Sequence, residues 1–242
     1  NRRPAPARVA AFRIPKPSTA AVPLMKIVAA KSILRANDLL AEENRARLDR
    51  AGVFALNVVG SPGAGKTTLL EAVVRHFGDR LRSAVVEGDI AGSIDAERME
   101  RIGVPVVQIN TEGACHLDAN MIASALGAFD LAALDLLVVE NVGNLVCTAG
   151  FDLGEHARLL VLSTSEGDDK AVKYPAIFQG SDALAITKCD LMDHVDFDPR
   201  RVRRDLERLN PNAEVFEVAA RQGVGITELC RWLAARIEAR RA

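Results

Sequence analysis

Residues 60–67 read Gly60-Ser61-Pro62-Gly63-Ala64-Gly65-Lys66-Thr67 and match the phosphate-loop pattern G-x-x-x-x-G-K-[ST] in full. This stretch directly follows the apolar run 53–59, so the strand and the helix that this motif requires on either side are both indicated. Glycines let successive backbone N–H groups turn toward a phosphate, and the next helix directs the positive end of its dipole at the same anion. An ordinary glycine-rich turn is the alternative, but the complete pattern in its complete context favours a nucleotide-binding protein.

The motif gives its last residues separate tasks. We expect Lys66 to reach the β- and γ-phosphates and to act in catalysis, and the Thr67 hydroxyl to take a place on Mg²⁺. The predicted nucleotide-binding residues of this loop are Gly60, Ser61, Pro62, Gly63, Ala64, Gly65, Lys66, Thr67 and Thr68.

Beyond the loop, short apolar runs alternate with helical patterns. Strands are predicted near 53–59, 84–88, 104–109, 134–140, 158–163, 183–187 and 215–219. Helices are predicted at about 66–78, 93–102, 116–128, 169–179, 199–209 and 226–240. Runs this apolar indicate strands buried on both faces. The alternation predicts an α/β P-loop NTPase with a mainly parallel, doubly wound sheet flanked by helices, in which ligands bind beyond the carboxyl ends of the strands.

Composition limits the partners that this chain is expected to have. Its 242 residues and 49% hydrophobic content suffice for one sizeable α/β domain. With 31 basic and 32 acidic side chains, the net charge of −1 argues against a nucleic-acid or membrane partner. No apolar stretch approaches the roughly 20 residues of a membrane span, and the four cysteines lie too far apart to suggest a disulfide framework. A cytoplasmic location is therefore expected.

The start of the chain differs from the rest. Residues 1–23 carry five of the ten prolines and five basic residues without an acid, which predicts a disordered tail, with a targeting segment as the alternative. Residues 24–242 are assigned to the P-loop domain, with a helical extension from 27 to about 50 at its N-terminus.

Carboxylates follow two of the predicted strands. Asp89 ends the second apolar run and Glu140 ends the fourth. Because a hard cation on phosphates requires carboxylate oxygens nearby, both residues are candidates for holding Mg²⁺ and for orienting the attacking water. The alternative is that either residue merely caps a helix.

The sixth run is followed by Thr187-Lys188-Cys189-Asp190, which resembles the guanine-selecting N-K-x-D motif of GTPases. A carboxylate at Asp190 can accept from two guanine donors for which adenine has no match. Lys188 is expected to lay its stem along the base, and Ala220 lies where GTPases carry an S-A-x-x-G loop. Thr187 in place of Asn and the loss of that Ser are expected to remove contacts that brace these loops. GTP and GDP are favoured over adenine nucleotides.

Cys115 and His116 are adjacent at the predicted start of a helix, and Cys147 follows the fourth strand at a short distance. Thiolates and imidazole together suit Ni²⁺ or Zn²⁺ better than Mg²⁺. A helix N-terminus also lowers the pKa of a thiol, which favours the metal-binding thiolate. The alternative is that these are ordinary packing cysteines. His156 is expected to be a surface or helix-end histidine.

The arrangement of these motifs resembles the HypB family of hydrogenase nickel-insertion GTPases, in the SIMIBI class of P-loop GTPases. The likeness covers about residues 27–235. The string Glu-Asn-Val-Gly-Asn-Leu-Val-Cys at 140–147 is its most specific part. The other matching segments are 37–38, 44–45, 88–89, 108–111, 115–121, 151–155, 166–170 and 173–178.

This resemblance implies a GTP-dependent homodimer whose interface holds Ni²⁺ or Zn²⁺ through Cys115, His116 and Cys147. It further implies delivery of nickel to the hydrogenase large subunit together with an accessory nickel-insertion protein. A rearrangement of 140–143 with the γ-phosphate would move Cys147 and change metal affinity. Asp168 and Lys170 are candidates for a bridge to the partner subunit, or form a solvated loop. The alternatives are a GTPase serving urease or a cobalamin enzyme, an ATP-driven scaffold, and a metal buffer with incidental hydrolysis.

Overall fold

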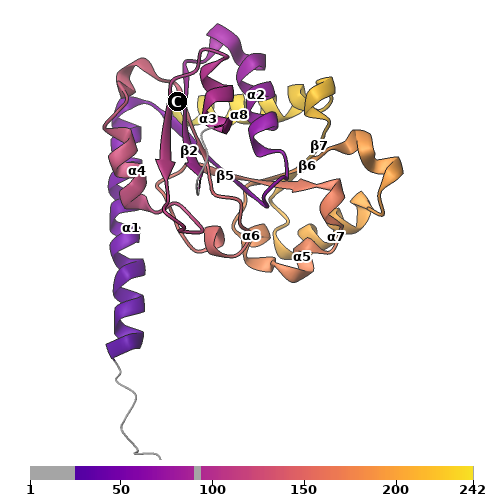
Figure 1. Ribbon diagram of the computed structural model, residues 1–242, viewed down its shortest axis with the longest axis horizontal. Helices are drawn as coiled ribbons and strands as arrows, with labels where there is room; N and C mark the ends of the chain where they lie inside the picture. The colour runs from indigo at the N-terminus through magenta and orange to yellow at the C-terminus, as the bar shows by residue number, and fades with distance from the viewer. Residues whose placement is uncertain (1–24, 90–93, 242) are drawn as a thin grey trace, which may run out of the picture.

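The computed structural model describes residues 25–89 and 94–241, so the predicted tail 1–23 lies outside the described residues. One seven-stranded sheet has the strand order β3-β2-β4-β1-β5-β6-β7 (Figure 1), and every neighbouring pair is parallel. The strands are β1 (Phe54–Gly60), β2 (Ser83–Asp89), β3 (Val106–Asn110), β4 (Leu136–Glu140), β5 (Ala157–Ser163), β6 (Ala183–Thr187) and β7 (Glu214–Val218). All seven predicted strands are present, and the predicted doubly wound P-loop fold is confirmed.

Helices connect these strands and cover both faces of the sheet. They are α1 (Met25–Ala51), α2 (Lys66–Phe77), α3 (Ile94–Glu100), α4 (Ala119–Leu126), α5 (Lys170–Lys173), α6 (Pro175–Gln179), α7 (Pro199–Leu209) and α8 (Ile226–Arg241). In Figure 1, α2, α3 and α8 lie on one side of the sheet, α5 to α7 lie on the other, and α1 runs beside α4. In the described part of the chain, no helix combines the length and the apolarity that a bilayer crossing needs.

Two predicted helices differ from the structure for identifiable reasons. The helix predicted over 169–179 is two short helices, because Pro175 has no N–H to continue α5 and instead occupies the first turn of α6. The helix predicted from 116 begins at Ala119, because the Asp118 carboxylate accepts from the Met121 N–H at 2.8 Å and caps it there. Cys115 and His116 therefore lie in the loop before α4, and not at its first turn.

The core consists of three apolar clusters around a fully buried β1. Phe54, Leu56 and Val58 face α2 and α8, whereas Ala55 packs with the α1 and α4 side. A third cluster joins β5 and β6 to α5, α6 and α7. Because β1 is buried on both faces, the loop that follows it is anchored on a rigid element at the centre of the sheet.

The side chain of His156 is buried and the residue lies directly before β5, so the expectation of a surface or helix-end histidine is wrong. Its side chain is 1% exposed, its Nδ1 accepts from the Ala55 N–H at 2.7 Å, and its Nε2 lies 3.0 Å from an Asp49 carboxylate oxygen. Because Nδ1 accepts a backbone proton, the neutral ring carries its own proton on Nε2. Burial lowers the pKa of His156, and nearby Arg240 lowers it further. This histidine joins β1, β5 and the end of α1 at the amino ends of the strands.

A nucleotide cavity and a cysteine–histidine cluster

Two cavities meet at the carboxyl ends of the strands, where the fold predicts ligand binding. One of about 490 Å³ is lined by the phosphate loop and by the ends of β2 and β4. The second, of about 360 Å³, lies beside β6, and the two share Gly65, Thr68, Lys188 and Arg221 as lining residues. Together they offer one compartment for phosphates and one for a base. A larger cavity of about 770 Å³ lies near Phe54 and Trp232 at the amino ends of the strands, which is not where such sheets bind nucleotides.

The phosphate loop has the shape that its sequence predicts. Gly63 and Gly65 adopt φ angles of 73° and 93°, which favour glycine, and the Ala64 N–H donates to the Ser61 carbonyl at 3.2 Å. Lys66 is nearly buried and its Nζ donates to the Ser61 carbonyl at 3.3 Å. The Lys66 ammonium group thus bonds to its own loop, in the cavity where it would bond to phosphates when a nucleotide is present.

Glu140 is a buried residue that lines the first cavity. Its Oε1 accepts from the Thr67 hydroxyl at 2.9 Å, and its Oε2 is buried without a hydrogen-bond partner among the described residues. Burial raises the pKa of Glu140 to about 7, although Lys66 opposes the shift. Asp89 lines the same cavity. The structure therefore brings Lys66, Thr67, Asp89 and Glu140 together as the sequence predicts.

Sequence reasoning missed a third carboxyl group in this cavity. Glu87 is 3% exposed and lies opposite Glu140 in the β2–β4 register, and its Oε2 is buried without a partner in the described chain. Burial and the neighbouring Glu140 raise the pKa of Glu87 to about 9. The available signal was the period of two along β2, which puts Glu87 on the same face as Asp89. A buried carboxyl pair with unpaired oxygens fits a divalent cation.

The base compartment corrects one sequence expectation. The Thr187 hydroxyl donates to the Ala64 carbonyl at 2.5 Å, so threonine braces the phosphate loop and the expected loss of this contact is wrong. Lys188 Nζ donates to the Gly63 carbonyl at 2.8 Å, which ties β6 to the same loop a second time. Asp190 and Ala220 line this cavity, as predicted for the two sides of a base.

Cys115, His116 and Cys147 converge within one subunit. Their ligand atoms all lie within 4.8 Å of one another, and the Cys115 Sγ is 3.6 Å from His116 Nδ1. The Phe151 ring stacks on the His116 ring with centroids 3.9 Å apart. The hydrogen bond between the Cys147 and Cys115 sulfurs, in which the Cys147 thiol is the donor, raises the pKa of Cys147. Burial lowers the pKa of His116, which favours the neutral imidazole that metals bind. Two thiols and an imidazole fit Ni²⁺ or Zn²⁺.

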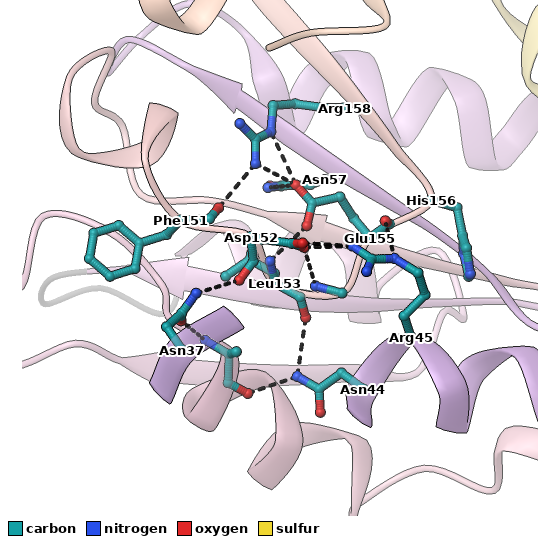
Figure 2. A network of polar contacts seen from close by, with 12 residues as sticks. Asn37, Asn44, Arg45, Asn57, Phe151, Asp152, Leu153, Glu155, His156 and Arg158 are labelled. Atoms are coloured by element: carbon teal, nitrogen blue, oxygen red, sulfur yellow. Dashed lines mark hydrogen bonds and ion pairs between the residues drawn. The ribbon is translucent and has the colours of Figure 1, made fainter. Parts of the chain in front are cut away.

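The long α1 helix holds the loop that carries Phe151 (Figure 2). Asn37 donates to the Asp152 carbonyl at 2.9 Å and accepts from the Ala119 N–H at 2.9 Å. Arg45 pairs with the Asp152 carboxylate at 2.7 Å. Segments 37–38, 44–45 and 151–155, which the sequence singles out far apart, therefore lie side by side next to the cysteine–histidine cluster.

The remaining candidates, Asp168 and Lys170, have partners within their own chain. Asp168 accepts from Arg201 at 3.0 Å and from the Asp198 N–H at 3.2 Å. Lys170 donates to the Glu166 carbonyl at 2.6 Å. Neither residue is among those that line the two cavities just described.

Comparison with known proteins agrees with this geometry. The model of the CobW/HypB/UreG nucleotide-binding domain family matches residues 54–217. The chain is 47% identical over 203 residues to the hydrogenase maturation factor HypB of Azotobacter vinelandii, covering 84% of this chain and 67% of that protein. It is 43% identical to the probable HypB of Methanocaldococcus jannaschii, covering 84% and 92%.

A solved structure extends the comparison to the fold. The crystal structure of HypB from Helicobacter pylori in complex with nickel superimposes with a TM-score of 0.81 at 36% identity, covering 84% of this chain and 96% of that one. The resemblance inferred from the sequence motifs is confirmed. This chain therefore belongs to the HypB family of hydrogenase maturation factors, within the CobW/HypB/UreG nucleotide-binding proteins.

Proposed function

We propose that this protein is a GTPase that delivers nickel to the large subunit of a [NiFe]-hydrogenase. One observation carries the proposal: the nucleotide cavity and the cysteine–histidine cluster share the segment 140–147, which begins at Glu140 and ends at Cys147. The family and the nickel complex of the H. pylori relative support the choice of cargo. Zn²⁺ accepts the same donors and remains the competing ion.

The phosphate compartment is proposed to hold GTP with Mg²⁺. Thr67, Asp89 and Glu140 would hold the ion, which the unpartnered Glu140 oxygen and the raised pKa of Glu140 support. Mg²⁺ would neutralise charge on the phosphates. Lys66 would exchange the Ser61 carbonyl for the β- and γ-phosphates, and a carboxylate of Asp89 or Glu140 would orient the attacking water by accepting its hydrogen bond.

The base compartment supports the choice of guanine. Asp190 would accept from the two donors on the guanine edge, while the Lys188 stem and Ala220 would face the ring. Leu191, 39% exposed, adds an apolar wall to the same cavity. The bonds from Thr187 and Lys188 to the phosphate loop would keep base and phosphate recognition in a fixed relation.

Nickel is the cargo, and we propose that the cluster binds it in a GTP-dependent homodimer. Cys115, His116 and Cys147 supply three donors, fewer than the four of a closed tetrahedral site, so further ligands would come from a second copy or from a receiving protein. Val146, 65% exposed next to Cys147, offers an apolar contact for such a partner. The proposed receivers are an accessory nickel-insertion protein and the hydrogenase large subunit.

The variant Lys66→Ala tests the proposal. In a strain that lacks its own copy of the gene, the wild-type protein should restore nickel loading of the hydrogenase large subunit, and the variant should not. Lys66 is not one of the three donors, and its Nζ donates to the Ser61 carbonyl, so nickel binding by the purified variant without nucleotide should persist. Full loading by Lys66→Ala would favour the metal buffer, and restoration of urease alone would reassign the target enzyme.

A further inference from the structure

Asn141 joins the end of β4 to the metal-binding loop. Its side chain is buried, with the residue only 2% exposed, and its Oδ1 accepts from the backbone N–H of Leu117 at 3.1 Å and of Val142 at 3.0 Å. Leu117 directly follows His116. A single amide oxygen therefore links the strand that carries Glu140 to the loop that carries His116.

The orientation of this amide is fixed by the groups behind it. Asn141 Nδ2 donates to Asn57 Oδ1 at 3.3 Å, and Asn57 Nδ2 donates to Glu155 Oε1 at 3.0 Å. Glu155 also accepts from Arg158 at 2.6 Å, as Figure 2 shows for the Asn57, Glu155 and Arg158 part of the network. Because the carboxylate only accepts, each amide in the row must donate toward Glu155. The Asn141 carbonyl is thereby held toward Leu117.

Asn144 makes a second connection, from the phosphate loop to Cys147. Its backbone N–H donates to the Gly60 carbonyl at 3.1 Å, and its Oδ1 accepts from the Cys147 N–H at 2.9 Å. The segment also lies directly against the loop, because a Cβ placed on Gly143 would be 2.8 Å from the Pro62 nitrogen. The backbone of Cys147 is thus set by a residue that is itself bonded to the start of the phosphate loop.

We propose that Asn141 and Asn144 are positioning residues that couple the nucleotide to the metal cluster. The inference rests on the proposed function and names the residues through which it operates. A shift of the β4 end with the phosphates cannot leave the buried Leu117 N–H unpaired without a large cost, so the loop with His116 follows Asn141. Asn144 moves Cys147 in the same way. Two donors on separate loops then change position together, which alters the affinity for the metal.

The test measures the Kd for Ni²⁺ of the purified full chain in the presence of GDP and of a non-hydrolysable GTP analogue, with Mg²⁺ in both. In wild-type protein the Kd for Ni²⁺ should differ by about fivefold or more between the GDP state and the state with the GTP analogue. In Asn141→Ala and Asn144→Ala the ratio of the two Kd values should fall toward one. Asn144→Asp retains an acceptor for the Cys147 N–H and should retain the ratio.

Asn44→Ala is the matched control for lost buried hydrogen bonds. Asn44 donates to the carbonyls of Ala119 and Leu153, in the network behind the cluster but away from β4. Asn44→Ala should have a lower melting temperature than wild type but the same ratio of Kd values. If a general loosening of the loops were responsible, the ratio would fall in Asn44→Ala as much as in Asn141→Ala. Should Asn141→Ala fail to fold, Asn144→Ala and Asn57→Ala carry the test.

The outcomes separate the two proposals. A wild-type ratio of one would defeat the proposed nucleotide-dependent chaperone itself. A wild-type ratio well above one that survives in both alanine variants would leave that function intact and overturn the roles of Asn141 and Asn144. A ratio that falls equally in Asn44→Ala would also overturn them.

Discussion

At the amino ends of the strands, Asp135 is held by Arg82 at 2.9 Å and by Arg241 at 2.5 Å, whereas at the carboxyl ends Glu87 and Glu140 each keep a buried oxygen without a partner among the described residues. The Arg82 guanidinium holds the pKa of Asp135 well below its usual range, while burial raises the pKa of both glutamates. The Asp135 carboxylate is thus paired within its own chain, whereas the two glutamates at the carboxyl ends are not fully paired among the described residues. The difference separates residues that stabilise the fold from residues kept for function.

Of the substitutions considered at the two ends of the sheet, removal of the Glu140 carboxylate should change the activity of the protein most. We expect Glu140→Ala to lower the rate of GTP hydrolysis by about a hundredfold or more, because the Thr67 hydroxyl loses its acceptor and the proposed site for Mg²⁺ and water loses a carboxylate. The rate is measured as phosphate release at saturating GTP and Mg²⁺. Glu100→Ala, at an exposed carboxylate on α3, is the control. Hydrolysis within a few-fold of wild type would remove Glu140 from the catalytic groups.

The sequence predicts the strand ends but not which groups are buried there. Apolar runs located all seven strands, and the complete motif located the phosphate loop, because burial and backbone shape leave direct marks on local sequence. Glu87 was missed because its cost of burial depends on Glu140, which is far away in sequence and adjacent only in the sheet. His156 was misjudged for the same reason, since its partners Asp49 and Ala55 lie about a hundred residues earlier.

The geometry of the cysteine–histidine cluster also depends on contacts between residues that are far apart in the sequence. The residue types at Cys115, His116 and Cys147 suggest a transition metal, but adjacency in sequence says nothing about whether Cys147 reaches the other two. Their convergence depends on the capping of α4 by Asp118 and on the turn made by Asn144, both of which are side-chain contacts that no periodicity reveals. Pro175, in contrast, was a local signal for the break between α5 and α6.

Glu87→Gln should change the pH dependence of stability, because Glu87 is one of the two buried glutamates at the carboxyl ends of the strands. The folded protein holds a proton on Glu87 up to a pKa of about 9, whereas the unfolded chain releases it near 4.5. Between these values the folded state binds more protons, so the free energy of unfolding of wild type falls as pH rises. Glutamine removes this term, and without nucleotide or Mg²⁺ the variant should be more stable by on the order of 2 kcal/mol at pH 8.

Denaturant unfolding of both proteins at pH 5 and at pH 8 measures this difference, which should be small at the lower pH. Glu100→Gln changes an exposed carboxylate in the same way and should leave the pH dependence of wild type in place. A Glu87→Gln variant that is less stable than wild type at pH 8 would mean that Glu87 is a satisfied carboxylate, and the contrast between the two ends of the sheet would disappear.

His156 at the amino end should show the opposite and smaller pH dependence. Burial lowers the pKa of His156 in the folded state, so below about pH 6.5 the unfolded chain binds the additional proton and the free energy of unfolding falls as pH falls. Protonation would also place a proton on Nδ1, which could then no longer accept the hydrogen bond from the Ala55 N–H. Wild type should lose at most about 1 kcal/mol between pH 7 and pH 5.5 through this group, the limit set by protonation of the unfolded chain. His156→Gln should be less stable at pH 7 but flatter over this range, while His194→Gln, at an exposed histidine, should follow wild type. If the two glutamine variants have the same slope, His156 is not the acid-sensitive group, and the amino end owes its stability to the arginine pairs alone.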